Sequence, residues 1–244
     1  VADNPTGPYT FIRSGRVNPG ILPMDLDNEE AKARLAEIDY YTYDESKNPQ
    51  AEEWWTPEWR ADVDAGIIAE RDLEGGQMAR DMTLFGDQDG KAYHIYSAEE
   101  NLTLNIAELS DDYLSHTGKY IRMAPGGHNE APAVFFKDGT YWMITSGCTG
   151  WAPNAARMFS APSIMGPWTQ YDNPCRGENA DITFGGQSTF ILPYGDNFIF
   201  MADIWRPKHP SDARYLWLPI QFDENGLPFL EFMEKWDLNT FKAV

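Results

Sequence analysis

Residues 81–97 read DMTLFGDQDGKAYHIYS, residues 130–146 read EAPAVFFKDGTYWMITS, and residues 187–203 read QSTFILPYGDNFIFMAD. Each stretch places β-branched and aromatic residues on both sides of an Asp-Gly or Gly-Asp pair. Such pairs tolerate positive φ in tight turns, and the flanking residues are of the kinds that strands prefer. The three stretches therefore predict three antiparallel hairpins with one common pattern.

The hairpins recur at intervals typical of a β-propeller. They begin at residues 81, 130 and 187, which lie 49 and 57 residues apart. Propeller blades repeat at about 40–50 residues, and loop insertions lengthen some of them. A shorter motif, Gly166-Pro167-Trp168-Thr169, recurs as Gly7-Pro8-Tyr9-Thr10 and is expected at the outer strand of a blade. The sequence thus predicts an all-β propeller, with three blades in residues 77–244 and the end of a preceding blade in residues 1–20.

The predicted propeller is incomplete in this chain. Propellers close with about 4–8 blades, so three blades would leave open sheet faces. We expect roughly two further N-terminal blades in the working protein, either on a second chain or outside this sequence. Residues 21–76 differ in character: Asp27-Asn28-Glu29-Glu30 resembles a capping box, and Thr56-Pro57-Glu58-Trp59 resembles an N-cap followed by proline. This segment is expected to be a partly helical insertion.

The charge of the chain limits its partners. It has 38 Asp and Glu residues against 19 Lys and Arg, a net charge of -19. Such a surface repels nucleic-acid phosphates and anionic lipid, so neither nucleic acid nor a membrane is an expected partner. A neutral sugar that stacks on Trp and Tyr suits the composition better, although the acidity can also serve solubility alone. The two cysteines, Cys148 and Cys175, can pair or stay free.

Three polar residues occupy the same place in the three hairpins. Asp81, Glu130 and Gln187 each precede the turn residue of their hairpin, Gly90, Gly139 or Asp196, by nine positions. In a propeller, residues at the same register on the innermost strands of different blades face one central funnel. We therefore expect these three side chains to lie together. Glycoside hydrolysis needs a proton donor at the leaving oxygen, and a nearby like charge helps a carboxyl keep its proton. We predict a catalytic domain with Glu130 as the acid and Asp81 as its modulator; the alternative is that these residues cap strand ends.

The loops after the hairpins are expected to ring the pocket mouth. We predict substrate-binding roles for seven residues there: Glu100, Asn101, Cys148, Thr149, Trp151, Asn154 and Trp205. No metal site is expected, because the four histidines show no ligand spacing. Asp87-Gln88-Asp89-Gly90 resembles part of a calcium loop but lacks the later Glu, so a hairpin turn is predicted instead. No cofactor is required, and a structural calcium is possible without support from the sequence.

These motifs resemble glycoside hydrolase family 43. The general likeness rests on Asp81-Met82-Thr83-Leu84-Phe85, Glu130-Ala131-Pro132 and Gly166-Pro167-Trp168. Residues 145–154, 183–189 and 214–219 look like the exo-β-1,3-galactanase branch of that family. The likeness covers about residues 1–20 and 77–240.

The resemblance implies a five-bladed propeller that releases galactose from β-1,3-galactan, the backbone of arabinogalactan, with inversion. It places the general acid on Glu130 and the modulating aspartate on Asp81. The galactanase branch lacks the family's usual aspartate base, and Gln187 is expected in its place, as an imidic tautomer or by positioning water. A secreted or periplasmic location follows. Two alternatives stay open: a related propeller hydrolase acting on arabinan or xylan, and a non-catalytic glycan-binding propeller.

Overall fold

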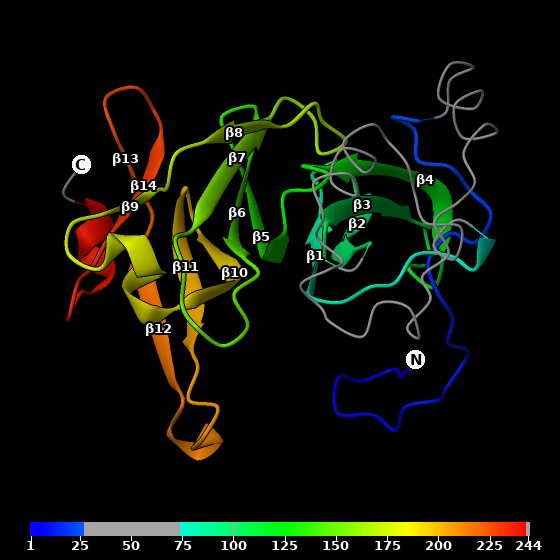
Figure 1. Cartoon of the computed structure of the whole chain (residues 1–244), viewed down its shortest axis with the longest axis horizontal. Coiled ribbons are helices and arrows are strands. Elements are labelled where there is room, and N and C mark those ends of the chain that lie inside the picture. The colour runs from blue at the N-terminus through cyan, green and yellow to red at the C-terminus, as the bar shows by residue number, and fades with distance from the viewer. Residues whose placement is uncertain (27–73, 100, 243–244) are drawn as a thin grey trace, which may run out of the picture.

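The computed structural model describes residues 1–26, 74–99 and 101–242 (Figure 1). Its regular structure consists of strands and short 3-10 helices, so the all-β prediction is confirmed. The 3-10 helices span Ala180–Gly185, Pro210–Asp212 and Leu238–Lys242. The strands are β1 (Met82–Gly86), β2 (Ala92–Ala98), β3 (Thr103–Leu109), β4 (His116–Met123), β5 (Asn129–Lys137), β6 (Thr140–Gly147), β7 (Arg157–Ala161), β8 (Thr169–Tyr171), β9 (Cys175–Arg176), β10 (Gln187–Tyr194), β11 (Asn197–Ile204), β12 (Arg214–Pro219), β13 (Gln221–Phe222) and β14 (Pro228–Glu231).

The three predicted hairpins are present as β1–β2, β5–β6 and β10–β11, all antiparallel. In the second hairpin Asp138 and Gly139 have φ values of 49° and 81°. Two successive positive φ values give a turn whose twist matches that of the flanking strands. Residues 87–90 form a hairpin turn as predicted, and the hydroxyl of Tyr141 donates to Asp87 Oδ2 at 2.6 Å.

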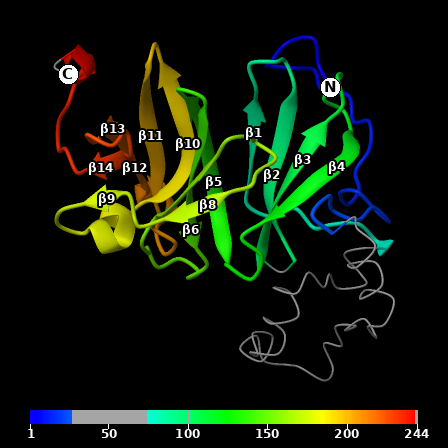
Figure 2. The same ribbon diagram turned by 90° about the horizontal axis from the view of Figure 1, so that it is seen from above.

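The strands form three main antiparallel sheets that follow one another along the chain. Their orders are β1-β2-β3-β4, β5-β6-β7-β8 and β10-β11-β12, and a small sheet, β13-β14-β9, follows the third. Figure 2 shows the three main sheets side by side, with the β5–β8 sheet in the middle. Strand β5 contacts both β1 and β10. The first strands of the three hairpins are therefore neighbours in space.

Two apolar cores hold the sheets together. Between the first and second sheets, Ile95 and Ile106 pack with Met143 and Phe159. Between the second and third, Ile144 packs with residues that include Phe200 and Leu218. Burying one such side chain stabilises the fold by about 1.5–3 kcal/mol, so both interfaces resist sliding.

The N-terminal segment is attached to the first sheet by hydrogen bonds to β4, beside a buried ion pair that lies within the sheet. Arg122 of β4 donates to both carboxylate oxygens of Glu99, at 2.7 and 2.8 Å, and its backbone N–H donates to Asp25. Val17 forms an antiparallel bridge with Gln77, and the hydroxyl of Tyr120 donates to the carbonyl of Ile21. Residues 17–25 thus lie on the first sheet.

The domain boundaries predicted at the N-terminus stay predictions. The motif Gly166-Pro167-Trp168 leads into the edge strand β8, which begins at Thr169, and Gly7 has the same φ as Gly166, 85°. Residues 1–16 contain no strand, although Val1 and Thr10 exchange two hydrogen bonds of 2.7 Å. Most of the predicted insertion, residues 21–76, lies outside the described residues. Within the described part of the chain, no helix has the length and apolar character to cross a membrane.

Apolar side chains are exposed on strand β1 of the first sheet and on strands β10 and β12 of the third. Side chains alternate between the faces of a strand, so residues next to buried ones point away from the core. On β12, Tyr215 and Trp217 are 75% and 49% exposed, whereas Leu216 and Leu218 are buried. The exposed apolar set comprises Met82 and Leu84 on β1, Phe190 and Leu192 on β10, and Tyr215 and Trp217 on β12.

Replacing Arg122 with alanine should lower the free energy of unfolding by about 3–5 kcal/mol, because it leaves the buried carboxylate of Glu99 uncompensated. The matched control is Lys119→Ala on the same strand, whose ammonium is 61% exposed beside Glu108. That change should cost less than about 1 kcal/mol. Urea denaturation of both variants measures the difference, and equal losses would contradict the structural importance of the buried pair.

Candidate active site

The three residues predicted to converge lie together in the structure. Asp81 directly precedes β1, Glu130 is the second residue of β5, and Gln187 begins β10. The Asp81 charge and the side chain of Gln187 both act on the Glu130 carboxyl. Two residues, each about 50 positions from Glu130 in the sequence, thus lie beside its carboxyl group. Their chemical roles remain predictions.

The carboxyl of Glu130 is half-buried and surrounded by polar side chains. Asn101 Nδ2 donates to Glu130 Oε1 at 2.8 Å, and the thiol of Cys148 and the amide of Gln187 lie near the carboxyl and favour its charged form. Burial and the charge of Asp81 raise the pKa of Glu130, while Cys148, the charge of Arg80 and Gln187 oppose that shift. The net direction is upward, so this carboxyl keeps its proton to higher pH than an ordinary glutamate.

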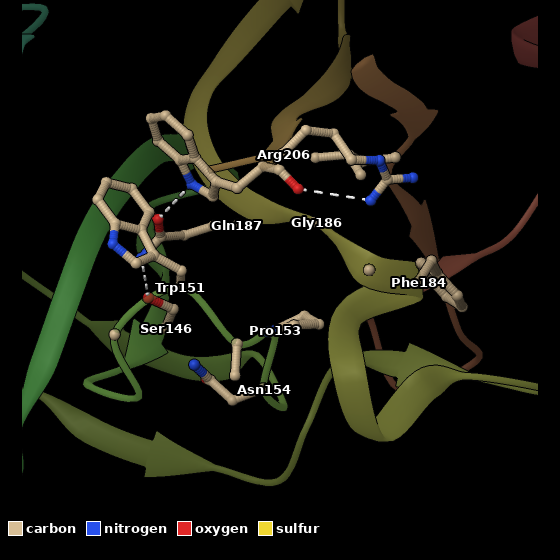
Figure 3. Close-up of a pocket in the computed structure, with 13 residues that line it drawn as sticks. Ser146, Trp151, Pro153, Asn154, Phe184, Gly186, Gln187 and Arg206 are labelled. Carbon is tan, nitrogen blue, oxygen red and sulfur yellow. Dashed lines mark hydrogen bonds between the residues drawn. The ribbon is translucent and has the colours of Figure 1, made fainter. Parts of the chain in front are cut away.

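The amide of Gln187 bridges two side chains from other strands and loops. Trp205 Nε1 donates to Gln187 Oε1 at 3.0 Å, and Gln187 Nε2 donates to Ser146 Oγ at 2.9 Å (Figure 3). Ser146 was not among the predicted site residues. Its position could have indicated it, because Ser146 ends the second repeat and pairs directly with Glu130 across the hairpin.

A pocket of about 200 Å³ lies beside Gln187. Figure 3 shows Gln187, Trp151 and Asn154 around it. Trp151 and Trp205 both line it and meet edge to face, with ring centroids 5.2 Å apart. Trp151 is 64% exposed, so its ring is accessible to a ligand. The remaining walls come from residues 146, 150, 152–154, 184–187, 204 and 206.

Asn154 and Thr149, predicted to bind substrate, use their side chains for hydrogen bonds within the loop itself. Asn154 Oδ1 accepts from the backbone N–H of Gly147 at 2.7 Å, and Asn154 Nδ2 donates to Gly147 O and Thr149 Oγ1. Thr149 in turn donates to the carbonyl of Ala152 at 2.6 Å. These bonds hold the turn that carries Cys148 and Trp151, so Asn154 both borders the pocket and shapes it.

Asn101 and Cys148 lie against Glu130, whereas Glu100 lies outside the described residues. Burial, followed by the charge of Glu130, raises the pKa of Cys148 to about 12, so its thiol stays protonated and can donate.

Cys148 and Cys175 are both free and form no disulfide with each other. Asn101 Oδ1 is buried without a hydrogen-bond partner, and such an acceptor is available to a ligand hydroxyl.

The described residues contain no cluster of three or more His, Cys, Asp or Glu side chains suited to a metal ion. Two of the four histidines do meet, since His94 Nδ1 lies 3.1 Å from His116 Nε2. Burial, and next the charge of His116, lowers the pKa of His94 to about 4, so this pair is neutral at pH 7. It lies on the first sheet, on strands β2 and β4.

Comparison with known proteins gives a consistent result. The model of glycosyl hydrolases family 43 matches residues 47–228. The solved β-1,3-galactosidase BT3683 with galactodeoxynojirimycin is 58% identical, with a TM-score of 0.86, over 97% of this chain and 66% of its own. An exo-β-1,3-galactanase from Phanerochaete chrysosporium with galactose is 34% identical, with a TM-score of 0.58, over 64% of this chain and 36% of its own.

A curated relative, a β-D-galactofuranosidase from Aspergillus niger, is 26% identical over 126 residues, which are 50% of this chain and 36% of that protein. The chain therefore spans between about a third and two thirds of the length of these relatives. The matched residues make up about three quarters of the chain, and they include all three hairpins and the carboxyl site between them. The chain belongs to glycosyl hydrolase family 43.

Proposed function

We propose that this chain carries the acid site of an inverting glycoside hydrolase that releases galactose from β-1,3-galactan, the backbone of arabinogalactan. The observation that carries the proposal is the Glu130 carboxyl, half-buried beside Asp81, which raises its pKa. Support for the sugar comes from relatives: BT3683 is a β-1,3-galactosidase, and the Phanerochaete chrysosporium galactanase has been solved with galactose and with β-1,3-galactotriose.

Glu130 is the proposed general acid. A protonated carboxyl transfers its proton to the glycosidic oxygen as the bond to the anomeric carbon breaks. Burial and Asp81 supply the neutral acid at the start, and Asn101, Cys148 and Gln187 stabilise the carboxylate that remains. Asp81 acts on Glu130 through its charge.

Gln187 is the proposed positioning group for the attacking water. Inversion requires water on the face of the sugar opposite the leaving group. An amide is a weak base, so Gln187 contributes by holding the water in line through the second lone pair of Oε1, which the bond from Trp205 leaves available. Every group in this scheme is a side chain, and the scheme assigns no step to a metal or cofactor.

Trp151 and the unpartnered Asn101 Oδ1 are the proposed sugar contacts. One face of galactose is largely apolar and suits an exposed indole, while Asn101 Oδ1 can accept from a sugar hydroxyl. A polysaccharide of this kind does not cross a membrane unaided, which supports a secreted or periplasmic protein.

The complete fold is proposed to be a five-bladed propeller. The first and third sheets lie at the two ends of the row of sheets (Figure 2). They carry the exposed apolar side chains of β1, β10 and β12, against which further blades would pack. Faces of this kind mark interaction sites. The remaining N-terminal blades, in the same polypeptide or on a second chain, are the proposed occupants.

Replacing Glu130 with glutamine should lower kcat on β-1,3-galactotriose by about 100-fold to 10,000-fold, because the proton donor is lost. Glu231→Gln, an exposed change on β14, is the control and should keep the wild-type rate. Galactose release is measured by chromatography, and proton NMR should find the α-anomer first. Full activity of Glu130→Gln would contradict the role of Glu130 as the acid. A wild-type protein that binds galactan without cleaving it would favour a glycan-binding module, and faster wild-type turnover of arabinan or xylan would reassign the substrate.

Replacing Asp81 with asparagine should move the basic limb of the kcat/KM profile to lower pH. The sign follows from the acid's role: Glu130 must be protonated, Asp81 raises its pKa, and removal of the charge lowers that pKa. Activity is then lost at a lower pH than in the wild type. A limb that stays in place, measured from pH 4 to 9, would contradict the assigned role of Asp81.

Replacing Trp217 or Leu84 with glutamate should lower the stability of the protein by roughly 2 kcal/mol or more, if further blades bury these positions. The control is Leu114→Glu, which is 46% exposed in the turn between β3 and β4. That change should cost less than about 0.5 kcal/mol. Thermal unfolding measures the stability of all three variants. Equally small losses of stability in all three would contradict the proposal that further blades cover Trp217 and Leu84.

A further inference from the structure

The two ends of the Gln187 side chain are alike in shape and opposite in chemistry. The oxygen accepts hydrogen bonds and the NH₂ group donates them. Rotation of the amide by half a turn exchanges the two with little change in packing. The function of Gln187 at Glu130 therefore depends on which end faces the acid, and some neighbour must select it.

Most neighbours of the amide cannot make that selection. The hydroxyl of Ser146 can donate or accept, and the Glu130 carboxyl can do either according to its protonation. The indole of Trp205 differs because its Nε1–H is a donor only. It lies 3.0 Å from Gln187 Oε1, and the opposite amide orientation would place two donors against each other.

The sheet register explains why Trp205 is available for this contact. Gln187 pairs with Asp203 across β10 and β11, and Trp205 follows just after the end of β11. The Trp205 ring is supported by Trp151, which meets it edge to face at 5.2 Å. The donor thus belongs to the same sheet as the amide it faces.

We propose that Trp205 is a positioning residue: its indole N–H holds the Gln187 amide with the oxygen on Trp205 and the nitrogen towards Ser146 and Glu130. This inference rests on the proposed function and adds to it. It gives Trp205 a role in addition to that of a stacking surface for the sugar. It also favours the ordinary amide of Gln187 over the imidic tautomer, because the amide oxygen is the better acceptor for an indole N–H.

The orientation has a consequence for the acid. With its nitrogen on Ser146, which pairs with Glu130 across the hairpin, the amide favours the carboxylate and opposes the rise in pKa that burial and Asp81 cause. A reversed amide would present its oxygen and favour the protonated acid. The other charged or titratable groups that act on Glu130 are Asp81, Arg80 and Cys148, and a change at Trp205 leaves all three in place.

The test replaces Trp205 with phenylalanine, which keeps an aromatic ring for stacking and removes the N–H. We expect kcat on β-1,3-galactotriose to fall roughly tenfold, KM to stay within about twofold, and the basic limb of kcat/KM to move to higher pH. This shift is opposite to that expected for Asp81→Asn. The matched control is Trp168→Phe, which removes an indole N–H bonded to the carbonyl of Ile164 at 3.1 Å on the outer part of the second sheet. The control should keep wild-type kinetics.

Three outcomes would overturn the proposal: a wild-type kcat and pH profile in Trp205→Phe, a change in KM alone, or an equal change in Trp168→Phe. Failure of the proposed function is a separate result, namely a wild-type protein that includes its N-terminal blades and releases no galactose. In that event the contact between Trp205 and Gln187 is tested through the pKa of Glu130. Carbon NMR of ¹³C-labelled glutamate measures that pKa. A higher pKa in Trp205→Phe than in the wild type supports the contact, and an unchanged pKa refutes it.

Discussion

The packing of the β5–β8 sheet between its two neighbours determines where every side chain of the site lies. Met143 and Phe159 of this sheet enter one core, while Ile144 and Met158 enter the other. Because side chains alternate between faces, a shift of one residue would move both sets out of their cores. Strand β5 is thereby held in register, and Glu130 at its start is kept between Asp81 and Gln187.

The environment of Glu130 combines influences of opposite sign. Burial and a neighbouring carboxylate favour the neutral acid, whereas donors from Asn101, Cys148 and Gln187 favour the anion. A group that must first hold a proton and then release it benefits from both. Each donor comes from a different element: a loop after β2, a loop after β6 and the start of β10. The pKa of this carboxyl is thus set by the assembled sheets together, not by its own strand.

The same alternation that builds the two cores leaves the outermost faces apolar. Leu216 and Leu218 of β12 enter the core. Tyr215 and Trp217 alternate with them along the strand and therefore point outward. On β1, Met82 and Leu84 lie on the exposed face while Phe85 packs on the core. Sheets with core residues on both sides suit an architecture in which every sheet has two neighbours, and the relatives matched by this chain are longer than it is.

Local sequence by itself determined the three hairpins, their common register and the convergence of Asp81, Glu130 and Gln187. Turn chemistry and two-residue alternation act over a few residues, so they can be recognised in the chain. Tertiary structure alone decided that Asn154 holds its loop, that Ser146 and Trp205 face the Gln187 amide, and that Glu99 pairs with Arg122. These contacts depend on which loops meet and on which way each side chain turns once the sheets have packed.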